Sequence, residues 1–403
     1  MKLRRTAMAG VCAAALLLPP GVSRAEPGPA AGRPAVQRLS EGADGYASEI
    51  SITPNGRYAV FSSGASNLVA GDTNGETDVF VRDLRTGRTE RISVAADGTQ
   101  GDYSSLDAAI SDNGRYVVFD TWAANLPGGP GIHLKDRRTG ELTFVGGDLG
   151  GRFIGTYNPA VSADGRYVAF SARVPTPRPA APRTGVKDLR TGELRIIEAP
   201  GAENARFSAN GRWVAYTSRP SGPPPNVPSD VLLWDSSTGQ SRNLAVAQDG
   251  APENGKSYAA DLTPNGRYAV FHSSSTNLVP GEDPNGKGLN VFVRDDRTGA
   301  LERIDGVEPG HQTTVGSLSA DGRRVVFRSG GATEGAWYVR DLRTGRTEQA
   351  ISKVTGEPAA AEVEPGSLDA RGRTLVFASG DGELLPDPPA VPVSHVYSGR
   401  LSR

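Results

Sequence analysis

Cysteine and histidine are scarce in this chain of 403 residues, which has one cysteine and four histidines. Cys12 lies in an apolar stretch near the amino terminus, so the rest of the chain has no thiol for a disulfide bond or for thiol chemistry. The histidines have no Glu-x-x-His or cysteine partner, which gives no zinc motif, and no nucleophile–base motif for catalysis is recognisable. They are His133, His272, His311 and His395.

The chain also lacks an excess of charge of either sign. Lys and Arg number 44 against 45 Asp and Glu, and without residues 1–25 the balance becomes 40 against 45. No basic cluster is present, so a nucleic-acid partner is not expected. The two signs are evenly mixed along the chain, which gives no stripe for binding a membrane surface.

Residues 1–25 are typical of a secretory signal peptide. Lys2, Arg4 and Arg5 precede an apolar run over 6–18, and Ser23-Arg24-Ala25 has the small residues of a cleavage site near Ala25. The run is shorter than the roughly 20 residues of a membrane span, so stable insertion is not expected. Residues 26–35, rich in Pro, Gly and Ala, are predicted to be a disordered linker. The expected location is secreted or extracytoplasmic.

A short stretch recurs seven times, first as Thr-Pro-Asn-Gly-Arg-Tyr-Ala-Val-Phe over 53–61. Asn-Gly and Asp-Gly favour a tight turn, and the uninterrupted β-branched and aromatic residues that follow predict a strand covered on both faces. The copies are centred on Gly56, Gly114, Gly165, Gly211, Gly266, Gly322 and Gly372.

A second recurring stretch reads as strand, Thr-Gly turn, strand, which indicates a β-hairpin. Together with the segment before each first turn, it gives four strands in about 53 residues, close to the period of a propeller blade. The sequence therefore predicts an all-β, seven-bladed β-propeller over 36–403, built of four-stranded antiparallel blades. The strand at 36–40 is expected to pair into the last blade, begun near residue 366, and so to close the ring without an open edge.

The repeated pattern Ser-x-Asp/Asn-Gly-Arg-Tyr-Val-x-Phe, followed by Val-x-Asp-x-x-Thr-Gly, resembles the TolB-like propeller repeat, which is related in shape to WD-repeat blades. The resemblance implies either a periplasmic interaction module or a substrate-gating domain of a peptidase. The chain has only the linker where TolB has an α/β domain, and it contains no Gly-x-Ser-x-Gly elbow of a hydrolase domain.

The predicted function is therefore that of an exported, monomeric binding module of the cell envelope or extracellular space. Its ligand is expected to be a peptide, a protein or a glycan, bound at the face that carries the variable loops. The alternative is a propeller-fold hydrolase or lyase, either lactonase-like or glycan-cleaving, because a fold alone does not separate the two classes.

Residues that recur in every blade are expected to serve the blade rather than one site. An Arg follows each first turn and an Asp precedes each second turn, on the same face of the disk, so an ion pair is predicted in each of the first six blades. In order, the pairs are Arg57 with Asp83, Arg115 with Asp136, Arg166 with Asp188, Arg212 with Asp235, Arg267 with Asp295, and Arg323 with Asp341.

The binding site is predicted at the opposite mouth of the channel, where residues precede each innermost strand. Tyrosine is enriched there and offers amphipathic contact area; the alternative is that these tyrosines pack between blades. Trp122 and the loop 272–289 flank the predicted ring. Its members, eight to eleven positions ahead of the turn glycines, are Tyr46, Tyr103, Tyr157, Glu203, Tyr258, His311 and Glu364.

One loop has enough oxygen-bearing side chains to suggest a metal. Asp72, Asn74, Glu76 and Asp78 alternate along the chain and could be ligands of Ca²⁺. The EF-hand spacing is not met, because Gly75 stands at the fourth position. The alternative is an Asn-Gly turn among solvated carboxylates. No other cofactor is expected.

Overall fold

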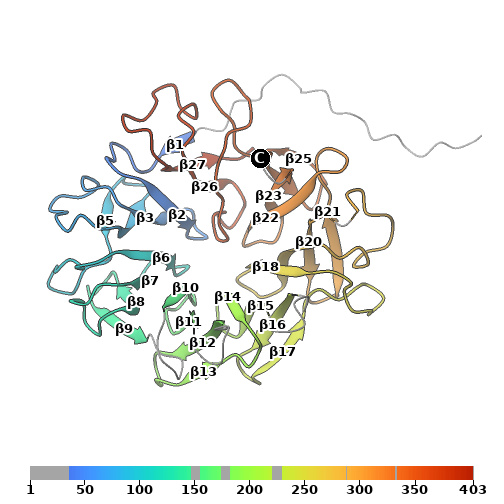
Figure 1. Ribbon diagram of the computed structural model, residues 1–403, viewed down its shortest axis with the longest axis horizontal. Helices are drawn as coiled ribbons and strands as arrows, with labels where there is room; N and C mark the ends of the chain where they lie inside the picture. Colours follow the sequence, from blue (N-terminus) through green and yellow to red (C-terminus); the bar gives the residue numbers. More distant parts are fainter. Residues whose placement is uncertain are drawn as a thin grey trace, which may run out of the picture. The chain divides into compact units, whose positions relative to one another are not determined.

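The fold is taken from a computed structural model that describes residues 36–146, 155–173, 182–219, 229–286, 288–331 and 334–402. The predicted signal peptide and linker lie outside these residues. The described residues form strands, turns and loops and no helix, so none of them makes a helix able to cross a membrane. The strands form seven blades around a ring (Figure 1).

The first three blades each contain four antiparallel strands in sequence order. Blade 1 contains β2 (Ala47–Ile52), β3 (Tyr58–Ser63), β4 (Asp78–Asp83) and β5 (Thr89–Arg91). Blade 2 contains β6 (Ser105–Ile110), β7 (Tyr116–Thr121), β8 (Gly131–Asp136) and β9 (Leu142–Gly146). Blade 3 contains β10 (Thr156–Val161), β11 (Tyr167–Arg173), β12 (Pro182–Asp188) and β13 (Leu194–Ile196).

The next three blades repeat the same order. Blade 4 contains β14 (Ala202–Phe207), β15 (Trp213–Ser218), β16 (Asp230–Asp235) and β17 (Gln240–Asn243). Blade 5 contains β18 (Ser257–Leu262), β19 (Tyr268–Ser273), β20 (Asn290–Asp295) and β21 (Ala300–Ile304). Blade 6 contains β22 (Gln312–Leu318), β23 (Arg324–Gly330), β24 (Gly335–Asp341) and β25 (Thr347–Gln349).

The seventh blade closes the ring as predicted. Its sheet joins β26 (Thr374–Ser379), β27 (His395–Arg400) and the amino-terminal β1 (Val36–Arg38). Val36 pairs with Gly399, and Figure 1 shows the two ends of the propeller side by side. The segment 362–368 takes the innermost place but makes only two isolated bridges to β26. Pro365, which has no N–H, interrupts the ladder there.

The apolar core lies between the blades. One cluster joins Val60 and Val81 of blade 1 to Val117 and Phe119 of blade 2, and comparable clusters occur at the other seams. The second strand of each blade is therefore covered on both faces, as its uninterrupted apolar sequence predicts. In β3, every residue after Tyr58 is buried.

Each blade also packs against the next blade through the side chain of the residue that follows the turn arginine. A Cβ added to Gly165 of blade 3 would lie 2.2 Å from Tyr116 Cδ2 of blade 2, so the turn glycine leaves room for the neighbouring ring. The φ of Gly165 is +75°, which also favours glycine. The same contact recurs between Tyr58 and Gly114, Tyr167 and Gly211, Trp213 and Gly266, and Tyr268 and Gly322.

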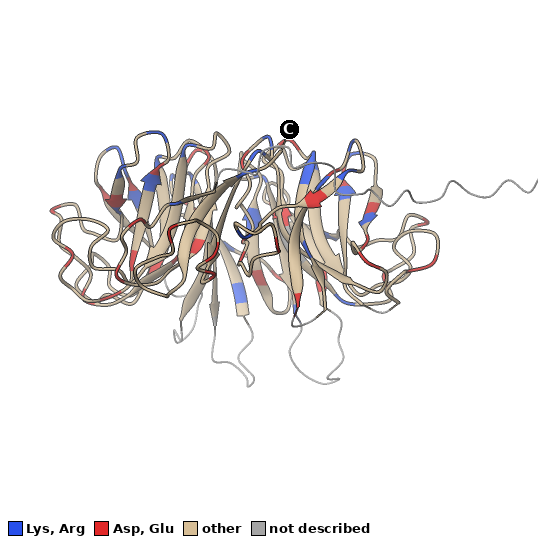
Figure 2. Cartoon of the chain, turned by 90° about the horizontal axis from the view of Figure 1, so that it is seen from above, with Lys and Arg blue, Asp and Glu red and all other residues tan. Residues whose placement is uncertain are grey.

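The predicted ion pairs form in the first five blades. They lie on one face of the disk, and Figure 2 shows positive and negative residues close together near that face. Each guanidinium also lies over the ring of the next residue, at 4.6 to 4.7 Å from its centroid. The pairs are Arg57 with Asp83, Arg115 with Asp136, Arg166 with Asp188, Arg212 with Asp235, and Arg267 with Asp295.

The prediction was wrong for the sixth blade. Arg323 and Asp341 form no ion pair in the described part of the chain. The physical reason is the next residue, which is Arg324 instead of an aromatic ring, so the guanidinium of Arg323 has no platform on which to lie. Asp341 still stabilises its own turn by accepting hydrogen bonds from the backbone N–H groups of Arg343 and Thr344.

Candidate functional site

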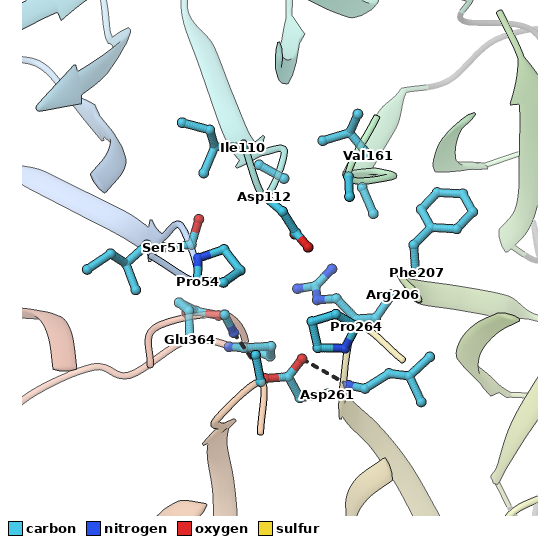
Figure 3. Close-up of a pocket in the computed structure, with 18 of the residues that line it drawn as sticks. Ser51, Pro54, Ile110, Asp112, Val161, Arg206, Phe207, Asp261, Pro264 and Glu364 are labelled. Atoms are coloured by element: carbon cyan, nitrogen blue, oxygen red, sulfur yellow. Dashed lines mark hydrogen bonds between the residues drawn. The ribbon is translucent and has the colours of Figure 1, made fainter. Parts of the chain in front are cut away.

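A cavity of about 350 Å³ occupies the central channel. Its walls are the later residues of the innermost strands and the turns that follow them, for example Glu49 to Ile52 and Pro54 in blade 1. Figure 3 shows side chains from several blades around it. The cavity therefore lies toward the face of the disk that carries the Arg and Asp turns.

Bulges in the innermost strands shape this wall. In blades 1 to 4 the ladder between the first and second strands shifts register, and one polar residue at each bulge has a positive φ. Short polar side chains tolerate this left-handed conformation better than most. These residues all stand seven positions before the turn glycine: Glu49, Asp107, Asn158 and Asn204.

A belt of hydrogen bonds links these bulge residues from blade to blade. The backbone N–H of Asp107 donates to Glu49 Oε2 at 2.9 Å, and the N–H of Asn158 donates to Asp107 Oδ2 at 3.2 Å. Asn158 Nδ2 donates to Asn204 Oδ1 at 2.6 Å. Glu49 and Asp107 thus accept backbone N–H groups of the next blade at its bulge, so the belt has a structural role.

Asp261 has a similar role on the other side of the channel. Its Oδ2 accepts hydrogen bonds from Ser317 Oγ at 3.1 Å, from the N–H of Leu318 at 3.1 Å and from the N–H of Gly366 at 3.2 Å. Figure 3 marks hydrogen bonds of Asp261 with dashed lines. One buried carboxylate therefore ties together blades 5, 6 and 7.

Three charged side chains in the cavity are left without such partners. Within the described ranges, the carboxylates of Asp112 and Glu364 make no hydrogen bond or ion pair. The guanidinium of Arg206 donates only to the carbonyl of Ala205, at 3.0 Å, and forms no ion pair there. Asp112 and Arg206 point into the cavity from blades 2 and 4 (Figure 3). These three residues are called the channel triplet below.

The surroundings of the triplet shift the ionisation of its carboxyls. Loss of solvent around Asp112 raises the pKa of its carboxyl. The pKa of Glu364 is raised mainly by the desolvating channel walls, with a smaller opposing effect from Arg206. Both changes favour the neutral acid and would be reversed by a nearby cation.

Asp112 and Arg206 were not predicted from the sequence, although a signal for them exists. Two positions before each turn glycine the repeats have Pro, Asp, Ala, Ala, Pro, Ala and Ala, so Asp112 departs from the pattern. Arg206 stands five positions before the turn glycine of its blade, where the other blades have Ser, Ala or Asp. A comparison of the repeats position by position would therefore have found both residues.

Three exposed aromatic residues of the predicted binding region lie at the loop end of blades 1 and 2: Tyr46 directly before β2, Tyr103 before β6, and Trp122 directly after β7, with its ring near Gly155 of blade 3. Tyr46, Tyr103 and Trp122 are 44%, 56% and 49% exposed, among the few large apolar side chains that are exposed in the described residues. Tyr46 Oη lies 2.6 Å from Thr77 Oγ1, and the N–H of Trp122 donates to the carbonyl of Ser104 beside Tyr103. These three aromatic residues are called the aromatic patch below.

The other predicted residues lie apart from this patch. Glu203 and Tyr258 meet through Arg219, whose Nη1 lies 3.3 Å from Glu203 Oε1 and whose guanidinium lies 5.2 Å from the Tyr258 ring centroid. Tyr157 lies half-buried in β10, and His311 lies half-buried just before β22. Glu364 belongs to the channel cavity. The predicted ring therefore divides into separate groups.

The predicted calcium loop holds a guanidinium among its carboxylates. Arg91 Nη1 lies 3.0 Å from Asp72 Oδ1 and 3.4 Å from Asp78 Oδ2. Asn74 donates its side-chain N–H to Asp78 Oδ2, and Glu76 Oε2 accepts a hydrogen bond from blade 2. Across the described residues, no group of three or more His, Cys, Asp or Glu is placed to hold a metal ion.

We expect the melting temperature to be the same with and without an excess of a calcium chelator. The reason is that Arg91 already supplies the positive charge between Asp72 and Asp78. The measurement is thermal unfolding with and without the chelator at equal ionic strength, because salt alone screens surface charges. A lower melting temperature with chelator, restored by added Ca²⁺, would contradict this expectation and support the calcium site.

Solved structures with the same fold are known. An oligogalacturonate lyase in complex with manganese superposes with a TM-score of 0.62 at 14% identity, covering 91% of this chain and 93% of the lyase. The β-propeller domain of the trilobed protease from Pyrococcus furiosus gives 0.56 at 13% identity, covering 89% and 94%. TolB from Acinetobacter baumannii gives 0.42 at 16% identity, covering 80% and 67%.

The first two likenesses show the fold alone, which is the β-propeller that the repeat predicts. No family model and no curated protein matches the chain. Manganese is bound in that lyase structure; in the part of this chain that the structure describes, no group of three or more His, Cys, Asp or Glu is placed to hold a metal ion.

Proposed function

We propose that this protein is an exported binding module that holds a peptide or a small glycan on its aromatic patch. The observation that carries the proposal is the exposure of Tyr46, Tyr103 and Trp122, each close to half exposed, at the loop end of two adjacent blades. Large aromatic side chains that remain in solvent mark binding surfaces, because leaving them there has a cost that a ligand removes. The signal-peptide pattern of residues 1–25 supports export.

The construction of the patch suits an adaptable ligand. Tyr and Trp give wide, rigid contact area with a polar tip, and they lose little conformational freedom on binding. Polar groups stand beside them, including Asp102 and Asn125, which hold the loop in place through the N–H groups of Ala124 and Asp102. A peptide backbone or sugar hydroxyls would find both flat apolar rings and hydrogen-bonding groups there.

The test is a double variant, Tyr103→Ala with Trp122→Ala, compared with the wild type. The immobilised proteins are exposed to envelope and medium of the native culture, and bound peptides, proteins and glycans are identified by mass spectrometry. The affinity for the captured ligand is then measured in solution. We expect the double variant to bind at least about 30-fold more weakly, since hot-spot aromatics contribute about 2 kcal/mol or more.

A matched control is Leu194→Ala, which removes another exposed apolar side chain from the outermost strand of blade 3. It should bind like the wild type. Equal binding by the wild type and the double variant would place the ligand elsewhere. The midpoint of thermal unfolding should be similar in all three proteins, because the replaced side chains are exposed.

A propeller-fold lyase or hydrolase is the second candidate. The lyase fold likeness and the raised pKa of several channel carboxyls favour it, because perturbed carboxyls in a cavity can serve as acids or bases. A polyanionic substrate such as oligogalacturonate fits poorly, since five carboxylates and one arginine line this cavity. Cleavage of the captured ligand by the wild type but not by an Asp112→Asn variant would establish this candidate instead.

A further inference from the structure

We propose that the ligand of the aromatic patch is a cationic peptide, an extended segment rich in Lys or Arg that the acidic loops of the same face attract. This inference rests on the function proposed above and names the class of ligand for the same site. The cationic side chains of the peptide would contact the rings of the patch, and the loops would supply the long-range attraction.

The fold sorts the charges of the chain onto two faces. Because neighbouring strands are antiparallel, the turns after the first and third strands of every blade share one face, called the turn face. All other connections share the opposite face, called the loop face. Between the strand ends, the turn face has 16 Lys or Arg and 7 Asp or Glu. The described connections of the loop face have 3 Lys or Arg and 18 Asp or Glu.

The excess of acids on the loop face is not cancelled by pairing. In the described residues, four of these 18 acids form ion pairs, namely Asp72, Asp305, Asp381 and Glu383. The connections outside the described residues add three cations and one acid to the sequence, which leaves the sign of the balance unchanged. A face with one dominant sign of charge attracts ligands of the opposite sign and accelerates their association. The loop face therefore favours a cationic ligand.

Negative charge lies next to the aromatic patch along the chain. Asp44 stands two residues before Tyr46, and Asp102 directly precedes Tyr103. The hydroxyl and the N–H of Ser66 donate to the carboxylate of Asp44 at 2.6 and 2.7 Å. The hydroxyl contact in particular holds the pKa of Asp44 below its usual value. This carboxyl is thus ionised at neutral pH, when a Lys or Arg side chain is also charged.

The rings of the patch are available to a cation. The faces of Tyr and Trp attract cationic groups, and on the turn face five guanidinium groups lie 4.6 to 4.7 Å from ring centroids. Among the residues that the structure describes, no guanidinium lies over the ring of Tyr46, Tyr103 or Trp122. A cationic side chain of the ligand would take that place.

The positions of the rings indicate an extended ligand. Tyr46 directly precedes β2 of blade 1, and Tyr103 precedes β6 of blade 2. The ring of Trp122 would lie 3.9 Å from a Cβ added to Gly155 of blade 3. A ligand that contacts all three rings must extend across these blades, which a peptide does and a single amine does not. A peptide also has backbone groups that can form hydrogen bonds with the loops.

The experiment measures the fluorescence anisotropy of three dye-labelled peptides of equal length with the protein without residues 1–25. The peptides alternate Gly with Lys, with Gln or with Glu, so only their charge differs. At about 0.1 M salt we expect the Lys peptide to bind at least about 10-fold more tightly than the Gln peptide, and the Glu peptide to bind most weakly. At about 1 M salt the screening length falls from about 10 Å to about 3 Å, so this preference should shrink to about 3-fold or less.

Two pairs of substitutions locate the attraction. Glu41→Gln with Asp97→Asn removes two exposed charges from the loop face, and Asn can still accept the hydrogen bond from the N–H of Thr99. This variant should bind the Lys peptide about 3-fold more weakly at low salt. The matched control, Glu141→Gln with Asp164→Asn, removes two exposed charges from the turn face and should bind like the wild type. Four other blades have Asn at the position of Asp164, so the fold accepts it.

The aromatic-patch double variant separates this inference from the proposed function. It should lose binding of the Lys peptide at both salt concentrations, because salt does not screen the contact with the rings. Equal affinity of the wild type for the Lys and Gln peptides, lost in the double variant, would overturn the cationic ligand and leave the patch as a binding site. Full binding of the Lys peptide by the double variant would overturn both proposals.

Two further results would overturn the cationic ligand alone. One is no saturable binding of the Lys peptide at millimolar concentration, while a ligand captured from the native culture binds to the patch. The other is self-association of the wild type at low salt, measured by sedimentation, that blocks the Lys peptide. It would make the turn face of a second copy the occupant of the loop face.

Discussion

A Gly165→Ala variant should lose about 2–5 kcal/mol of its free energy of unfolding. Alanine at a left-handed φ of +75° costs about 1–2 kcal/mol. In addition, the new methyl would lie 2.2 Å from Tyr116 Cδ2, so the ring must move out of the seam between blades 2 and 3. Overpacking of this kind costs about 1–3 kcal/mol. The measurement is the midpoint and slope of urea unfolding.

Two controls separate the clash from the backbone effect. Gly140 has a φ of +79° and no atom within 4 Å of an added Cβ, so Gly140→Ala should lose only the backbone part. In a Tyr116→Ala background, Gly165→Ala should cost about as much as Gly140→Ala, because the opposing ring is gone. Equal losses for Gly165→Ala and Gly140→Ala in the wild-type background would show that the seam accommodates the methyl.

The fold could be predicted because the sequence repeats the same turn and strand patterns seven times. Each turn glycine, each uninterrupted strand and each Thr-Gly hairpin has a local physical reason, and the repetition identifies the propeller. The ring closure followed as well, since the segment before residue 40 resembles the last strand of a blade, and the structure pairs it with β27. The packing of Tyr116 on Gly165 of the next blade is a contact between repeats and could not be read from one repeat.

The candidate sites were less predictable, because they depend on which side chains from different blades face one another. The sequence predicted one ring of residues ahead of the innermost strands, but strand bulges and loops divide that ring. Tyr103 and Trp122 remain exposed, whereas Glu364 lines the channel. The missing ion pair of blade 6 has a different cause, which is local. Arg324 is a single departure from the repeat, at a position where the first five blades have an aromatic residue.

A Leu39→Ala variant should lose about 2–5 kcal/mol and should loosen the closure of the ring. Leu39 is 0% exposed and packs with Val376 and Val396 of blade 7. Its N–H donates to the carbonyl of Val396 at 2.8 Å, so it belongs to the segment that joins the two chain ends. Truncation of a buried leucine leaves a cavity and costs about 2–5 kcal/mol. Here it also weakens the attachment of β1, the strand directly before Leu39, to blade 7.

The distinguishing measurement is amide hydrogen exchange, because it reports where the structure opens as well as how stable it is. Leu142→Ala is the matched control, since Leu142 is a buried leucine in the outermost strand of blade 2, whose strands follow one another without a chain break. Both variants should lose global stability. In Leu39→Ala, residues 395–400 should also exchange faster than the innermost and middle strands of blades 1 to 6, because β27 loses its partner β1. If blade 7 exchanges in Leu39→Ala as it does in Leu142→Ala, the packing of Leu39 does not hold the closing strand. The strand would then be held by its backbone ladder and by Ser40, whose Oγ accepts a hydrogen bond from the N–H of Val396.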